Sequence, residues 1–134
     1  MAATFYSGFK SKRSALNFLL DNLYSGFQMK KNICVVLKDK AHSESLKEAQ
    51  RNKYFENSKI EYLYDLNISI LEEQPKDNFD EIHIFSDKVS NLDSCQKAEV
   101  YVYTTEVDIE INDASRKLYA NLKTNNFELN HERI

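Results

Sequence analysis

The run of residues 32–37, NICVVL, constrains the fold of this chain most strongly because it is almost entirely apolar. A strand that is apolar on both faces is typical of the centre of a parallel sheet, where other elements cover both sides. Parallel strands need long crossover connections, and these connections are usually helices. The run therefore predicts an α/β domain in which helices alternate with strands.

A strand and a helix are expected before this run. Residues 4–9 have the pattern of a short strand that ends near Gly8. Ser11 or Ser14 could cap the helix that follows, because a serine oxygen accepts the free N–H groups of a first turn. Gly26 is expected to end this helix in a left-handed turn. Five large apolar residues follow the helical period between these ends, at Leu16, Leu19, Leu20, Leu23 and Phe27.

A second, shorter helix is expected at residues 42–52. Ser45 and Glu48 have the spacing of a capping box, in which each side chain bonds the other residue's backbone N–H. Leu46 and Ala49 would then face the core.

Four further strands and a final helix complete the pattern. A polar loop is expected at residues 73–78 around Pro75, and residues 87–97 are expected to be a crossover loop or a weak helix. The strands are expected at residues 60–64, 67–71, 81–85 and 98–104. We therefore expect residues 1–134 to form a single α/β domain, with a mainly parallel open twisted sheet of five or six strands and helices on both faces.

Composition limits the class of protein. Hydrophobic residues make up 42% of the chain and charged residues 29%, as in an ordinary globular domain. The net charge of −3 argues against a general nucleic-acid binder, which carries a strong positive excess. No apolar run approaches a bilayer span, and the start MAATFYSGF lacks the pattern of a signal peptide. The expected location is the cytoplasm, without a membrane.

No cofactor, metal or catalytic site is expected. With only two glycines, neither in a phosphate-binding loop, P-loop and dinucleotide sites are excluded. Cys34 and Cys95 form no CxxC pair, and Cys34 is expected to be a buried reduced thiol. His42, His83 and His131 are dispersed, with no GxSxG motif and no metal-ligand spacing. The expected role of His83 is that of a hydrogen-bonded strand histidine.

The strongest candidate site lies near the C-terminus. Arg116, Tyr119 and Lys123 recur at spacings of three and four, which places them on one side of a helix. An apolar stripe falls on the opposite side and would face the core, with members Ile111, Ser115, Leu118 and Leu122. A guanidinium can hold a carboxylate with two parallel hydrogen bonds, so this face suits an acidic partner.

The order of these segments resembles the chi subunit of bacterial DNA polymerase III, a clamp-loader accessory protein. The resemblance rests on the opening TFY strand, on NICVVLKD, on NISIL with EQPKDN and DEIHIF, and above all on AEVYVYT followed by SRKLYANLKTNNFELNH. The chain departs from the family at residues 50–66, which lack its Leu-Trp pair and its Phe-Pro-His segment. About four extra residues also follow Gly26.

The resemblance implies a non-catalytic adaptor of the replicase. Chi proteins bind the psi subunit and the acidic C-terminal tail of single-stranded DNA-binding protein, so a monomer or a heterodimer with psi is implied, without direct nucleic-acid binding. Arg116 and Tyr119 match the tail-binding positions of the family, and Lys123 matches a basic position. Family lysines fall on Ala120 and Asn112, and Asn112 joins the expected acidic-peptide site.

Three alternatives remain open at this stage. Tyrosines on alternate strand positions could stack the bases of single-stranded nucleic acid, at Tyr62, Tyr64, Tyr101 and Tyr103. A small α/β enzyme could assemble a site only in three dimensions. An unrelated interaction protein, such as an immunity factor, is the third.

Overall fold

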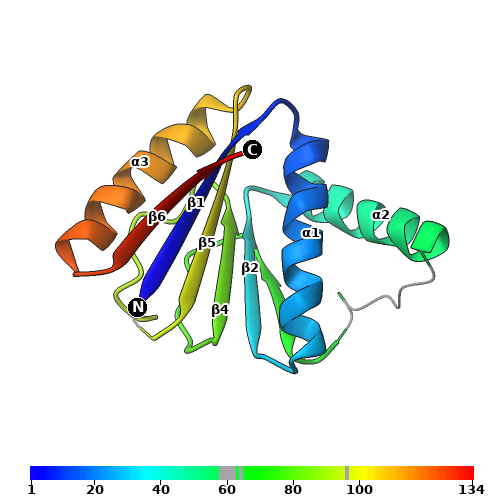
Figure 1. The fold of residues 1–134 in the computed structure, drawn as a ribbon, viewed down its shortest axis with the longest axis horizontal. Helices are drawn as coiled ribbons and strands as arrows, with labels where there is room; N and C mark the ends of the chain where they lie inside the picture. The colour runs from blue at the N-terminus through cyan, green and yellow to red at the C-terminus, as the bar shows by residue number, and fades with distance from the viewer. Residues whose placement is uncertain (58–62, 64, 96) are drawn as a thin grey trace.

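The computed structural model of the chain describes residues 1–57, 63, 65–95 and 97–134. Its centre is a six-stranded sheet in the order β3-β2-β4-β5-β1-β6, and every pair of neighbouring strands is parallel (Figure 1). The elements along the chain are β1 (Ala2–Phe9), α1 (Lys12–Gln28), β2 (Ile33–Leu37), α2 (Lys40–Asn57), β3 (Ile68–Leu71), β4 (Glu81–Phe85), β5 (Glu99–Thr105), α3 (Ile109–Thr124) and β6 (Glu128–Arg133).

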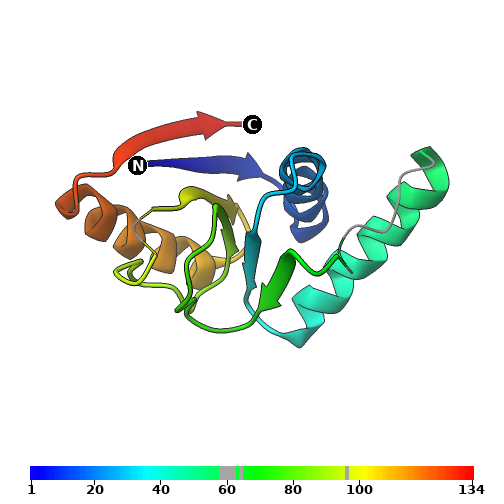
Figure 2. The ribbon, with the colours of Figure 1, turned by 90° about the horizontal axis from the view of Figure 1, so that it is seen from below.

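Helices cover both faces of the sheet, which confirms the predicted α/β class. One core cluster joins α1 and α2 to side chains such as Val35 and Tyr103. The other joins α3 to the opposite face of the same strands, through residues such as Val36 and Val102. All five residues of β2 are buried, as expected for a central strand. Figure 2 shows α3 and the α1–α2 pair in separate regions of the molecule.

The first helix begins where expected but ends later. The Ser11 hydroxyl accepts from the backbone N–H of Ser14, and the Ser14 side chain bonds back to Ser11, so the two serines form a reciprocal cap. The prediction that Gly26 ends the helix is wrong, because α1 continues to Gln28. The residue with a left-handed backbone is Lys30, with φ of 57°. A Cβ at Gly26 would meet Glu81 Oε1 at 2.7 Å, so close packing explains this glycine.

The second helix begins earlier than expected. The predicted capping box at Ser45 and Glu48 is wrong, because α2 starts at Lys40. The carboxylate of Asp39 accepts from the backbone N–H of His42 at 2.9 Å, so an aspartate supplies the missing partner at the first turn. Leu46 is fully buried, as expected.

The last strand, β6, was not predicted. Asn126 takes a left-handed conformation with φ of 64° and turns the chain back from α3 along the outer edge of β1. Most of the strand expected at residues 60–64 lies outside the described residues. The other strand predictions agree with the structure to within two residues at each end.

The segment between β4 and β5 is irregular in its described part, residues 86–95 and 97–98, rather than helical. It still contributes Val89, Leu92 and Cys95 to the core. Cys34 is a buried free thiol, as expected, and burial raises its pKa to about 12. Within the described residues, none of the helices combines the length and the apolar character that crossing a bilayer requires.

Candidate functional site

A crevice of about 340 Å³ lies between α3 and the edge of the sheet, lined by Phe5, Arg116, Tyr119 and His131. The sequence of α3 fixes which side of the helix faces it. The Asp108 carboxylate caps the helix by accepting from the backbone N–H of Ile111 at 3.1 Å. Leu118 and Leu122 are buried against the sheet, so the arginine and the tyrosine are directed toward the rim.

Tyr119 and Phe5 form the apolar floor of this crevice. Their rings meet edge to face, with centroids 5.2 Å apart. Phe5 is buried in β1, whereas Tyr119 is 41% exposed, so part of its ring is available to a ligand. An exposed aromatic surface supported by a buried ring is a suitable contact for an apolar or aromatic group.

Arg116 supplies the cation. Its side chain is 78% exposed, and its guanidinium bonds the carboxylate of Asp113 at 2.9 Å, one turn earlier on the helix. An exposed ion pair of this kind contributes only about 0–1 kcal/mol. The guanidinium can therefore exchange this partner for a carboxylate of a ligand.

Strand β6 forms the second wall. His131 Nε2 lies 2.9 Å from the hydroxyl of Ser7 on β1, which holds the ring beside the crevice. The end of β6 passes close to Gly8, whose φ is +92° and whose added Cβ would meet the backbone oxygen of Ile134 at 2.7 Å. Only glycine fits this conformation and this approach without strain.

A second cavity of about 400 Å³ adjoins the first and shares Arg116 and His131 with it. It lies at the carboxyl ends of β1, β5 and β6, which is where open parallel sheets bind ligands. Asn112 lines it and donates from Nδ2 to the backbone oxygen of Thr105 at 2.7 Å. Arg133 adds a further cation, 3.9 Å from the carboxylate of Glu106.

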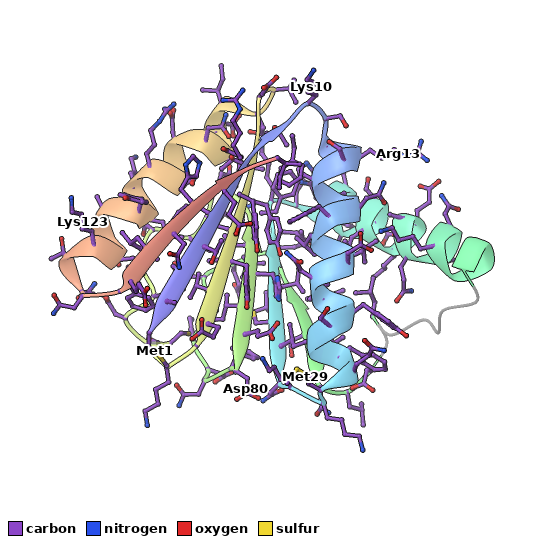
Figure 3. The ribbon with its side chains drawn as sticks, viewed as in Figure 1. Met1, Lys10, Arg13, Met29, Asp80 and Lys123 are labelled. Atoms are coloured by element: carbon purple, nitrogen blue, oxygen red, sulfur yellow. The ribbon has the colours of Figure 1, made fainter. Side chains whose placement is uncertain are left out.

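The structure brings the expected site residues together only in part. Arg116 and Tyr119 share one crevice, and Asn112 lines the adjoining cavity. Lys123 lines neither of these two cavities and lies near the far end of α3 (Figure 3).

Sequence reasoning missed the wall formed by β6, which carries His131 and Arg133, and the part of Phe5 in the floor. The signal that could have found it is the alternation of Phe127 and Leu129 with polar residues, since a two-residue period is typical of a half-buried strand.

A cluster around His83 has similar chemistry, but its histidine and tyrosine have no exposed surface. Glu81 accepts from Lys31 at 2.9 Å and from His83 Nε2 at 2.9 Å. His83 Nδ1 then accepts from the Tyr103 hydroxyl at 2.8 Å, and this hydroxyl accepts from Asn22 at 3.1 Å. His83 is thus a hydrogen-bonded strand histidine, as expected.

Burial fixes the charge states in this cluster. Burial lowers the pKa of His83, so the ring is neutral, although the hydrogen bond to Glu81 opposes this shift. Burial by itself would raise the pKa of Glu81, but the hydrogen bonds from His83 and Lys31 outweigh it, and the net pKa is lowered.

Two other kinds of site can be examined in the structure: a tyrosine platform for base stacking and a metal site. Tyr103 has no exposed surface and Tyr101 is half-buried, so these two rings offer little surface for base stacking. Tyr62 and Tyr64 lie outside the described residues. Within residues 1–57, 63, 65–95 and 97–134, no three His, Cys, Asp or Glu side chains are grouped to hold a metal ion.

Comparison of the chain with protein-family models and with curated protein sequences gives no match.

Proposed function

We propose that this protein is a non-catalytic adaptor of a bacterial replicase, similar to the chi subunit, which binds the acidic C-terminal tail of single-stranded DNA-binding protein. The observation that carries the proposal is the shared crevice of Arg116 and Tyr119, two residues that match the tail-binding positions of that family. The proposal also includes a second partner, the psi subunit, and a cytoplasmic location.

The crevice has the two features that the end of such a tail requires. The guanidinium of Arg116 can bond a terminal carboxylate, and a charge-assisted hydrogen bond contributes about 1.5–3 kcal/mol. The rings of Phe5 and Tyr119 can receive an apolar terminal side chain. The volume of about 340 Å³ is sufficient, since an apolar cavity of ~150 Å³ already binds benzene.

The local charge around the crevice favours an acidic ligand, although the net charge of the whole chain is −3. Arg116 lines both the crevice and the cavity beside it, and Arg133 lines that second cavity. Opposing carboxylates at Asp113 and Glu106 are exposed, so they screen these cations only weakly. Rim charges of this kind speed association and lose their effect as salt is added.

The test is a calorimetric titration of the full chain with an acidic peptide that ends in phenylalanine. The Arg116→Ala variant should lose about 1.5–3 kcal/mol of binding free energy, because the charge-assisted hydrogen bond is removed. Lys117→Ala is the matched control, since Lys117 is an exposed cation at the next position of α3 and lines neither cavity. Equal losses in the two variants would show that only net charge matters and would remove the proposed site.

The psi partner needs a separate test. Co-expression of the chain with a psi subunit, followed by size-exclusion chromatography, should give a heterodimer if the replicase assignment is right. Peptide binding without a heterodimer would support the crevice but not the clamp-loader role.

A further inference from the structure

One half of one sheet face is left without a helix among the described residues. On the side toward α1, the parallel register places side chains in rows across β5, β1 and β6. The first row is Ala2 and Glu128, with Glu99 two residues before Tyr101 on β5; the second is Tyr101, Thr4 and Asn130; the third is Tyr103, Tyr6 and Glu132. Figures 1 and 2 both show this surface of β1 and β6 uncovered, with α3 on the opposite side.

In the third row, α1 covers Tyr103 and Tyr6 but leaves Glu132 exposed. Tyr103 is fully buried and Tyr6 is nearly so, with the ring of Phe18 on α1 4.9 Å from that of Tyr6. In the first two rows Ala2, Thr4 and Tyr101 are half-buried. We call the surface formed by the first two rows together with Glu132 the open trough.

Exposure of a parallel sheet in this way is unusual, because such sheets are normally covered on both faces. The same strands are covered on their other face, where α3 buries Ala3 and Phe5. The open trough therefore resembles a position from which a covering helix is missing.

The charged side chains of the trough itself are all acidic, although the cation of Lys31, which is paired with Glu81, also acts on Tyr101. Glu99, Glu128 and Glu132 have no ion-pair partner among the residues that the structure describes, and the three rows contain no lysine or arginine. The charge of Glu132 also acts on Tyr6 beside the trough, since it adds to the effect of burial in raising the pKa of Tyr6. Charge complementarity therefore favours a cationic partner, and nucleic acid is disfavoured because the three carboxylates would repel its phosphates.

The dimensions fit an α-helix. Two strand spacings of about 4.8 Å separate β5 from β6, which is close to the ~10 Å diameter of a helix with its side chains. A helix that lies along β1 would have small residues, Ala2 and Thr4, beneath it. Glu99 would then lie on one flank and Glu128 with Glu132 on the other.

We propose that the open trough binds a helix of a partner protein that carries a narrow apolar stripe with lysine or arginine on both flanks. The small floor residues allow the helix to approach closely, and the carboxylates on the two flanks set its position. This site is independent of the peptide crevice, because His131 and Arg133 of β6 point to the other face, with Phe5 and Ser7. Both partners can therefore bind at once.

The test uses a synthetic amphipathic helical peptide with an alanine and leucine stripe flanked by lysines, titrated into the full chain and followed by amide NMR shifts. The largest shifts are expected at Ala2, Thr4 and Tyr101. Removing two flank charges, by Glu128→Gln with Glu132→Gln, should weaken binding about five-fold, as for two exposed ion pairs. Thr4→Arg should weaken it more, because it adds bulk and a like charge to the floor.

The matched control is Glu44→Gln with Glu48→Gln, which removes two exposed carboxylates from α2 and gives the same net charge. This control should bind like the unmodified chain, and thermal unfolding of each variant shows that the fold is kept. The proposal is overturned if the control weakens binding equally, if a scrambled peptide of the same composition binds as well, or if the shifts lie at Arg116 and Tyr119.

Discussion

Two clusters in this molecule combine a histidine, a tyrosine and a charged side chain, and they differ in access. Around His83, Tyr103 and Glu81, every polar side chain has a partner and the histidine and tyrosine have no exposed surface. Around His131, Tyr119 and Arg116, the tyrosine is 41% exposed and the arginine is paired with an exposed carboxylate, that of Asp113. Residue types alone therefore do not separate a structural cluster from a binding site.

The two clusters differ physically in whether water can take the place of a lost hydrogen-bond partner. In the buried cluster, loss of one partner leaves another polar group unsatisfied away from water, which costs about 1–3 kcal/mol. In the crevice, water replaces any lost partner, so its groups can exchange bonds with a ligand at little cost. We expect the first cluster to govern stability and the second to govern binding.

The largest contrast is expected from the two tyrosines. Tyr103→Ala should lower the free energy of unfolding by about 3–5 kcal/mol, because it empties a buried ring site and breaks the hydrogen bond to His83. Tyr119→Ala should cost only about 1 kcal/mol in stability, since this residue is 41% exposed. The same change should abolish peptide binding, because it removes the aromatic surface of the crevice. Urea unfolding together with calorimetry measures both effects. Similar stability losses in the two variants would contradict the distinction between a structural cluster at Tyr103 and a binding site at Tyr119.

A second contrast concerns pH. Burial lowers the pKa of His83 and of His42, so each stays neutral in the folded chain while its unfolded counterpart takes up a proton. Stability is therefore fully present above the ordinary histidine pKa and is lost as pH falls below it. Each histidine contributes a slope of up to about 1.4 kcal/mol per pH unit.

The measurement for this prediction is urea unfolding between pH 7 and pH 5.5. Glu81 adds little in this range, because its carboxyl is ionised in the unfolded chain and its pKa is lower still in the folded one. His83→Gln should reduce the slope, with the remainder due to His42. An unchanged slope would show that His83 is already protonated in the folded protein.

The smallest expected effect is an increase in affinity for the acidic peptide. The carboxylate of Asp113 lies 2.9 Å from the guanidinium of Arg116, so it competes with a ligand for this cation. Asp113→Asn should therefore strengthen binding of the acidic peptide by about 0.2–1 kcal/mol, the contribution of an exposed ion pair, with little change in stability. Calorimetry at low and high salt measures the gain, which should shrink as salt is added. Weaker binding in this variant would mean that Asp113 orients the arginine rather than competing for it.

The sequence predicted those helices and strands whose apolar residues recur with a clear period. The unbroken apolar run of β2 and the helical stripe of α1 both gave elements close to those observed. Element ends depended on contacts between distant residues and were less predictable. Gly26 lies inside a helix because Glu81 and Ile33 pack against it, which no local pattern reveals.

The candidate site was predictable on one side only. The spacing of Arg116 and Tyr119 placed them on one helical face, and they do share a crevice. The opposite wall depends on β6, a strand of mostly exposed polar residues whose pairing with β1 gives it order. Its alternation is weak, so His131 and Arg133 were not recognised as part of the site.

The most direct measurement of the central claim compares an acidic peptide that ends in a free phenylalanine carboxylate with the same peptide amidated at its C-terminus. If the crevice between α3 and β6 holds the carboxylate through Arg116, amidation should reduce affinity at least tenfold, and Arg116→Ala should bind both peptides equally weakly. Equal affinity of the two peptides for the unmodified chain would contradict the account.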